Sequence, residues 1–174
     1  ALKRSKANGF TRHFWDWGDM LNANASYFYP STPCTNLLFG LRESIQMLEE
    51  EGLDNVFARH ARFGEATRRA VRSWGLEILC EKPLEYSPVL TAVLMPEGKG
   101  ADAFRKVILE KFNMSLGNGL GKITDKVFRI GHLGDLNDLS LIGTLAGVEM
   151  GLSLGKIAHN SGGVASAMEY LQSA

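Results

Sequence analysis

Residues 127–134 restrict the fold more than any other stretch of the sequence. Apolar residues surround Arg129, and two glycines and a histidine follow it, which indicates a strand that turns just beyond the arginine. A guanidinium in such a strand needs an anionic partner, because burying an unpaired charge is costly. Its planar fork matches a carboxylate or a phosphate. Arg129 therefore either binds an anionic group of a small substrate or pairs with an Asp or Glu of the same chain.

Composition excludes several classes of partner. The 174 residues suit one buried domain, or a small domain with an extra arm. Lys plus Arg and Asp plus Glu both number 19, so no net charge favours nucleic acid. No apolar run approaches the roughly 20 residues that span a bilayer, and we expect no membrane partner. Cys34 and Cys80 are isolated, which indicates two buried free thiols in a reducing, cytoplasmic compartment and no metal site.

The first third of the chain combines an irregular arm with a long helix. Residues 1–26 are poorly patterned, and the aromatic cluster at 14–17 should bury against another part of the molecule or a second subunit. A helix with one apolar stripe is expected at 33–51, and Gly52 should end it.

The segment before this helix carries hydroxyl groups in a stiff loop. Pro30 and Pro33 bracket a pair of hydroxyl residues, so the loop should be extended. Thr32 fits the N-cap position, with Pro33 at the first helical position. The amides and positive dipole at the helix start, together with Tyr29 and Thr32, would form an anion site. Capping alone would also explain Thr32.

A second helix, expected at 54–74, carries a histidine and several arginines. His60 lies on the apolar stripe, which favours a packed core residue over a ligand or a base. Four arginines of this helix are expected on a solvated face: Arg62, Arg68, Arg69 and Arg72.

The remaining sequence alternates strands and helices. Strands are expected at 76–80, 88–96, 114–116 and 126–131. Helices are expected at 101–112, from Asp135 or Asn137 to 154, and around 164–171. This order predicts an α+β fold, with helices over one face of a small, mostly antiparallel sheet. The glycine-rich bend at 117–121 lacks the order of a nucleotide-binding loop, so its backbone should pass close to a ligand or a neighbouring strand.

Several of these motifs together resemble one known family. The matching stretches are Tyr29, Thr32 and Pro33, then 36–44, 119–121, 126–137, 147–150 and 162–165. Together they resemble the C-terminal portion of the class V, fold-type I aminotransferases that use pyridoxal phosphate, within the serine–glyoxylate and alanine–glyoxylate branch. The resemblance extends over nearly all of the chain.

This resemblance implies a domain organisation and a set of site residues. Residues 1–32 would be the remnant arm of the large domain with the cofactor-phosphate loop, 33–52 a connecting helix, and 53–174 the small C-terminal domain. Arg129 would bind the α-carboxylate of an amino-acid or 2-oxo-acid substrate. Tyr29 and Thr32 would hydrogen-bond the phosphate of pyridoxal phosphate in the active site of the partner subunit, which implies a homodimer.

The implied reaction moves the amino group of serine, or alanine, to glyoxylate or a similar 2-oxo acid. The lysine that holds the cofactor in relatives falls shortly before the position of Ala1, and no lysine of this chain matches it. We therefore expect no catalytic residue in this chain and no activity of the chain alone. Two alternatives remain: a non-catalytic small-molecule-binding or dimerisation module, and a pyridoxal-phosphate lyase of the same fold. Desulfurases, for example, need a mobile cysteine, which neither Cys34 nor Cys80 provides.

His132 has two possible roles. It could contact a substrate hydroxyl, which would favour serine over alanine, or it could be a structural donor to a loop carbonyl. The sequence favours the structural role.

Overall fold

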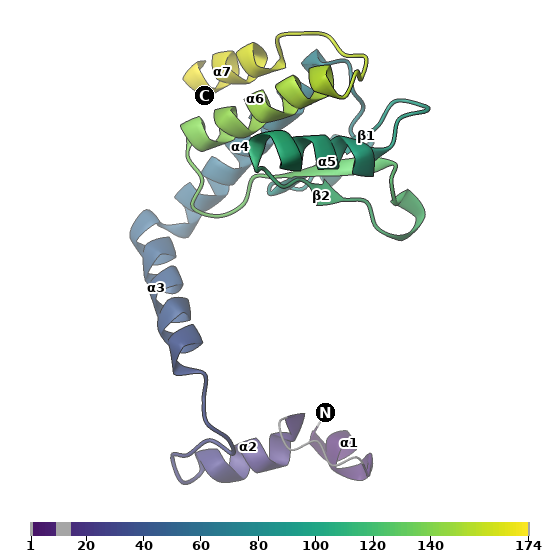
Figure 1. Cartoon of the computed structure of the whole chain (residues 1–174). Coiled ribbons are helices and arrows are strands. Elements are labelled where there is room, and N and C mark those ends of the chain that lie inside the picture. Colours follow the sequence, from purple (N-terminus) through teal and green to yellow (C-terminus); the bar gives the residue numbers. More distant parts are fainter. Residues whose placement is uncertain (1, 10–14, 174) are drawn as a thin grey trace. The chain divides into compact units, whose positions relative to one another are not determined.

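The computed structural model describes residues 2–9 and 15–173, and the chain divides into two compact units (Figure 1). The first unit comprises residues 1–50 and the second residues 51–174. Cys34 in the first unit is exposed and Cys80 in the second unit is half-buried, so the expectation of two buried thiols is wrong. The aromatic cluster expected at 14–17 falls partly outside the described residues, and Trp15 and Trp17 are exposed.

Three α-helices lie in the described residues of the first unit. They are α1 (Leu2–Ala7), α2 (Trp17–Asn24) and α3 (Thr35–Glu51). Asp16 caps α2, because its side chain accepts hydrogen bonds from the amides of Gly18 and Asp19 at 2.6 and 3.2 Å. The expected apolar stripe of α3 is present, but none of its residues is buried within this unit.

The start of α3 differs from the sequence prediction. The helix begins at Thr35, so Thr32 is not its N-cap and Pro33 is not its first residue. The carbonyl of Cys34 instead accepts hydrogen bonds from the amides of Leu37 and Leu38. Thr32 is thereby left outside the helix, with its hydroxyl free of a capping role. The end of α3 agrees with the prediction, since Gly52 follows it with a φ of +83°.

The second unit contains a three-stranded antiparallel sheet. Its strands are β1 (Leu90–Leu94), β2 (Gly117–Asn118) and β3 (Val127–Gly131), in the order β1-β3-β2. The strand expected at 76–80 is wrong, because only Ile78 forms an isolated bridge, to Val93, before the chain turns at Pro83–Glu85. The strand expected at 114–116 is also wrong, because the short strand that pairs with β3 here is β2, which begins at Gly117.

Four helices cover one face of this sheet. They are α4 (Leu53–Ser73), α5 (Ala101–Phe112), α6 (Asp138–Leu154) and α7 (Gly163–Ser173). Helices α4 and α5 pack on the sheet, and α6 and α7 pack against these two helices (Figure 1). Phe104 meets Phe128 edge-to-face at 4.8 Å in the core between α5 and β3. The predicted α+β fold, with helices on one face of a small antiparallel sheet, is confirmed.

The arginines of α4 are less solvated than expected. Arg68 is only 9% exposed, and Arg62 pairs with Asp138 at 2.8 Å while also donating to the carbonyl of Leu171. The expected solvated face is therefore wrong for these two residues, because α6, α7 and the segment before β1 cover that side of the helix. Arg69 and Arg72 do lie at the surface, where both contact Glu65.

Glu149 connects three helices of the second unit. Its carboxylate accepts hydrogen bonds from the indole of Trp74 at 2.8 Å and from the amides of Gly162 and Val164 at 2.9 Å. Burial acts to raise the pKa of Glu149, but these hydrogen bonds hold it below its usual value. The Trp74 indole also leaves no room for a side chain at Gly163, because a Cβ there would lie 2.1 Å from the indole nitrogen.

Candidate functional site

Strand β3 places Arg129 on the face of the sheet that the four helices leave uncovered. Side chains alternate along a strand, so Phe128 and Ile130 enter the core and Arg129 points the other way. Its partners in register are Ala92 of β1 and Gly117 of β2. We call the surface formed by Leu90, Ala92, Gly117 and Arg129 the open face.

The guanidinium of Arg129 has no partner within the described part of the chain. Its Nε is buried without a hydrogen bond, and none of the described residues forms an ion pair with it. Other arginines of the same unit are paired: Arg59 with Glu51 and Arg62 with Asp138. The interpretation that Arg129 pairs with an internal Asp or Glu therefore finds no counterpart among residues 2–9 and 15–173. A half-buried cation without a counter-ion is suited to binding an anion from outside.

Helix α4 anchors the turn that follows Arg129. His60 is buried, as predicted, and its Nδ1 donates to the Val56 carbonyl at 2.7 Å while its Nε2 accepts from the Gly134 amide at 3.2 Å. Arg59 donates to the Gly134 carbonyl at 2.8 Å and forms two hydrogen bonds with Glu51. The sequence predicted a packed His60, but not this anchoring role, since nothing local links the two segments. Helix α4 therefore holds Gly134, three residues beyond the end of β3, by both its amide and its carbonyl.

His132 lies on the core side of the sheet. Its side chain is fully buried, and its Nε2 is 3.0 Å from the Thr91 hydroxyl. Burial lowers the pKa of His132 to about 4, and the nearby Arg68 guanidinium adds to the effect. The ring is therefore neutral at pH 7. These contacts favour the structural role, because the ring faces away from the side that carries Arg129.

The glycine-rich bend at 117–121 brings backbone close to its neighbours, as the sequence predicted. A Cβ at Gly119 would lie 2.0 Å from the carbonyl oxygen of Ile123, so only glycine fits there. A Cβ at Gly117 would lie 3.0 Å from the Cβ of Arg129 and 3.1 Å from its Nε. The bend therefore folds tightly on itself and leaves room for the Arg129 side chain.

Tyr29 and Thr32 line one hollow in the first unit. This pocket of about 400 Å³ lies between α2 and the start of α3. Its walls are Met20, Asn24, Tyr29, Pro30, Ser31, Thr32, Pro33, Cys34, Leu37 and Leu38. Tyr29 and Thr32 are both exposed, and their hydroxyls form no hydrogen bond with any residue in the described ranges. Two free hydroxyl donors beside a helix start fit a phosphate, although no cationic side chain lines this pocket.

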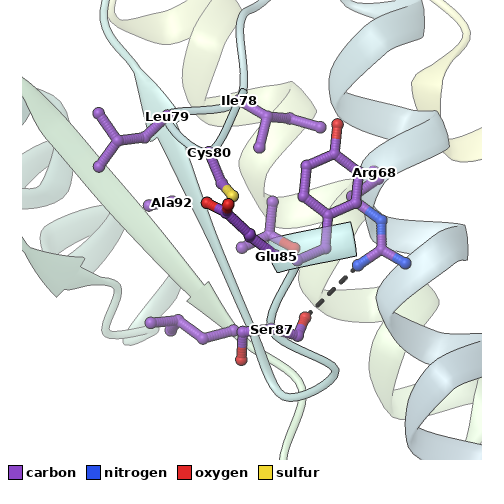
Figure 2. Close-up of a pocket in the computed structure, with 10 residues that line it drawn as sticks. Arg68, Ile78, Leu79, Cys80, Glu85, Ser87 and Ala92 are labelled. Carbon is purple, nitrogen blue, oxygen red and sulfur yellow. Dashed lines mark hydrogen bonds between the residues drawn. The ribbon is translucent and has the colours of Figure 1, made fainter. Parts of the chain in front are cut away.

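A second hollow lies at the outer edge of β1 in the second unit. Figure 2 shows this pocket of about 230 Å³, with Arg68, Cys80 and Ser87 around it. Arg68 is already engaged, since it contacts Glu65 at 3.2 Å, donates to the Ser87 carbonyl at 3.5 Å and lies over the Tyr86 ring at 4.9 Å. Its charge is therefore satisfied within the chain, in contrast to that of Arg129.

No group of three or more His, Cys, Asp or Glu side chains in residues 2–9 and 15–173 is arranged to hold a metal ion. Within the same ranges, no helix combines the length and the apolar composition of a membrane span.

Comparison with known proteins gives a consistent set of relatives. The serine–glyoxylate aminotransferase of Methylorubrum extorquens is 47% identical over 162 residues, which cover 92% of this chain and 40% of the relative. The serine–glyoxylate aminotransferase of Arabidopsis thaliana is 44% identical over 174 residues, which cover 99% of this chain and 43% of the relative. The chain thus spans about 40% of the length of these curated relatives. No protein-family model matches it.

The fold is also found in a solved structure. The crystal structure of ureidoglycine–glyoxylate aminotransferase from Bacillus subtilis matches with a TM-score of 0.87 at 23% identity. The match covers 97% of this chain and 44% of that chain. At this identity the likeness concerns the fold alone.

The burial of His132 predicts an acid-dependent loss of stability. Its pKa of about 4 in the folded chain lies below the ordinary value of 6.5, so the unfolded chain binds more protons between these values. The contribution of neutral His132 to the free energy of unfolding is intact above pH 6.5 and is lost as the pH falls. We therefore expect the free energy of unfolding to decrease by about 2 kcal/mol between pH 7 and pH 5. Urea denaturation at both pH values measures the difference.

The matched variants are His132→Gln and His159→Gln. Glutamine at position 132 keeps a donor for Thr91 but cannot titrate, so this variant should lose most of the acid-dependent change. Substitution of His159, which contacts Ser153 and the Ile157 carbonyl near the surface, should leave that change in place. An unaltered pH dependence in His132→Gln would contradict the assignment.

Proposed function

We propose that this chain, which is homologous over nearly its whole length to class V aminotransferases, is the C-terminal part of an enzyme that uses pyridoxal phosphate. The enzyme moves the amino group of serine, or of alanine, to glyoxylate or a similar 2-oxo acid. The observation that carries this proposal is the partnerless guanidinium of Arg129 on the open face. Relatives named for this reaction support it.

In this proposal Arg129 binds the α-carboxylate of the substrate. Its guanidinium offers two parallel donors, and the anion supplies the partner that the described residues do not provide. Binding the carboxylate also fixes the direction of the α-hydrogen, and orientation of this kind contributes about 7–11 kcal/mol in favourable cases. The same residue serves both substrates, because an amino acid and a 2-oxo acid both carry a carboxylate beside the reacting carbon.

Tyr29 and Thr32 would hold the phosphate of the cofactor. Their free hydroxyls line one pocket, and each can donate a hydrogen bond to a phosphate oxygen. When bound, pyridoxal phosphate withdraws electrons from the α-carbon of the substrate and thereby makes its hydrogen acidic. The lysine that holds the cofactor and moves that proton would come from outside this chain. Kinetic tests of Arg129, Tyr29 and Thr32 therefore require the whole protein.

We further propose that the enzyme is a homodimer with shared active sites. Tyr29 and Thr32 of one subunit would serve the active site that contains Arg129 of the other subunit. The exposed apolar residues of α3 support an arrangement in which further protein covers this helix.

Substitution of Arg129 should weaken substrate binding selectively. In the whole protein, we expect Arg129→Ala to raise KM for the amino acid and for the 2-oxo acid on the order of 100-fold, because a charge-assisted pair worth about 3 kcal/mol is lost. Arg129→Lys should also bind poorly, since an ammonium cannot reproduce the fork. The absorbance of the bound cofactor should be unchanged in both variants. Steady-state kinetics with each substrate varied measures the effect.

Lys126→Ala provides the control for these variants. It removes an exposed cation three residues from Arg129 and should leave both KM values near those of the wild type. If Arg129→Ala has wild-type kinetics, Arg129 does not bind the carboxylate.

Mixing two variants of low activity tests the shared active site. Assayed at substrate concentrations well below the KM of Arg129→Ala, this variant and the double variant Tyr29→Phe, Thr32→Ala should each have little activity as homodimers. In a mixed dimer, one of the two sites would receive Arg129 from one subunit and Tyr29 and Thr32 from the other, all unaltered. Random reassociation should therefore restore about one quarter of wild-type activity, because about half of the dimers are mixed and each has one intact site. If no activity returns after verified subunit exchange, the residues do not serve each other's subunits.

A further inference from the structure

The side chain of Arg129 lies directly over Gly117 of β2. The two residues are partners in register, and a Cβ at position 117 would lie 3.0 Å from the Arg129 Cβ and 3.1 Å from its Nε. A Cβ there would also lie 3.5 Å from the central carbon of the guanidinium. Since Gly117 lacks the positive φ that favours glycine, its backbone conformation would accept alanine. The reason for glycine is therefore the space that Arg129 occupies.

Strand β2 is held in place and could not move aside for a larger residue. Both of its residues pair with β3, and Arg105 of α5 donates from Nε to the carbonyl of Leu116 at 2.8 Å. Just after β2, Gly119 packs against the carbonyl of Ile123. An added methyl group at position 117 would meet the Cβ of Arg129, which can yield only with the backbone of β3, and the Nε, which can yield by rotation of the arginine side chain.

The opposite neighbour of Arg129 is also small. Ala92 is its partner in register on β1, so the arginine lies between two residues with little or no side chain. The Nε is buried without a partner, which leaves the far end of the guanidinium for an anion. Contact with the Gly117 backbone restricts the orientations open to the guanidinium, which no described residue holds by a hydrogen bond.

We propose that Gly117 is a positioning residue for carboxylate recognition, acting through Arg129. This inference rests on the proposed function, in which Arg129 binds the substrate carboxylate. Because Gly117 has no side chain, the guanidinium lies close to the backbone of β2, at the distance and in the orientation that the carboxylate requires. A single methyl group at this position moves the fork by a few tenths of an ångström. Enzymes are sensitive to such changes, since a misplacement of about 1 Å can cost on the order of 100-fold in rate.

Two competitive inhibitors of the whole protein test this proposal. Glycolate carries a carboxylate, and glycolamide has the same shape without the charge. The ratio of their inhibition constants measures carboxylate recognition independently of turnover. We expect Gly117→Ala to reduce the preference for glycolate about tenfold, while the thermal unfolding midpoint stays close to that of the wild type. Gly143→Ala is the matched control, because a Cβ at this exposed position in α6 would meet nothing within 4 Å.

A double variant separates positioning from general damage. In an Arg129→Ala background, Gly117→Ala should have no further effect on the inhibitor ratio, because the residue acts only through the arginine. An equal loss in both backgrounds, or a wild-type ratio in Gly117→Ala alone, would overturn the inference while leaving the proposed function intact. A wild-type ratio in Arg129→Ala would instead refute the proposed function, and this inference would fall with it.

Discussion

The second unit is organised around one cation that the described residues leave unpaired. The core requires Phe128 and Ile130 on one side of β3, and the period of a strand then directs Arg129 to the other side. Small residues in the adjoining strands give the guanidinium space, and no described acidic residue neutralises it. An arginine in this setting loses solvation without gaining an ion pair, and a ligand carboxylate would supply that ion pair.

The surrounding framework keeps this arrangement rigid. Arg59 and His60 of α4 hold the turn after β3, and Arg105 of α5 holds the residue before β2. Glu149 joins α4, α6 and the start of α7 behind the sheet. These contacts come from helices that are distant in sequence from the strands, so the position of the guanidinium depends on the whole second unit. Such support is what a preorganised binding group needs.

The sequence predicted the elements better than their contacts. The helix at 101–112 agrees with the structure residue by residue, because its helical period is clear and Gly100 and Asn113 delimit it. Arg129 could be singled out because a charge interrupts an apolar run. The strand predicted at 76–80 is wrong, since this segment forms only an isolated bridge at Ile78, and a local pattern does not show how much of a segment finds a pairing partner. The burial of Arg68 and the role of Gly117 depend on tertiary packing and strand register, which no local pattern reveals.

The most direct test of the central claim is a crystal structure of the whole protein with pyridoxal phosphate and 2-methylserine, which has no α-hydrogen and so cannot be transaminated. We expect two nitrogens of the Arg129 guanidinium to lie about 2.7–2.9 Å from the carboxylate oxygens of this ligand. A carboxylate held by another cation, with Arg129 paired to an Asp or Glu of the protein, would contradict it.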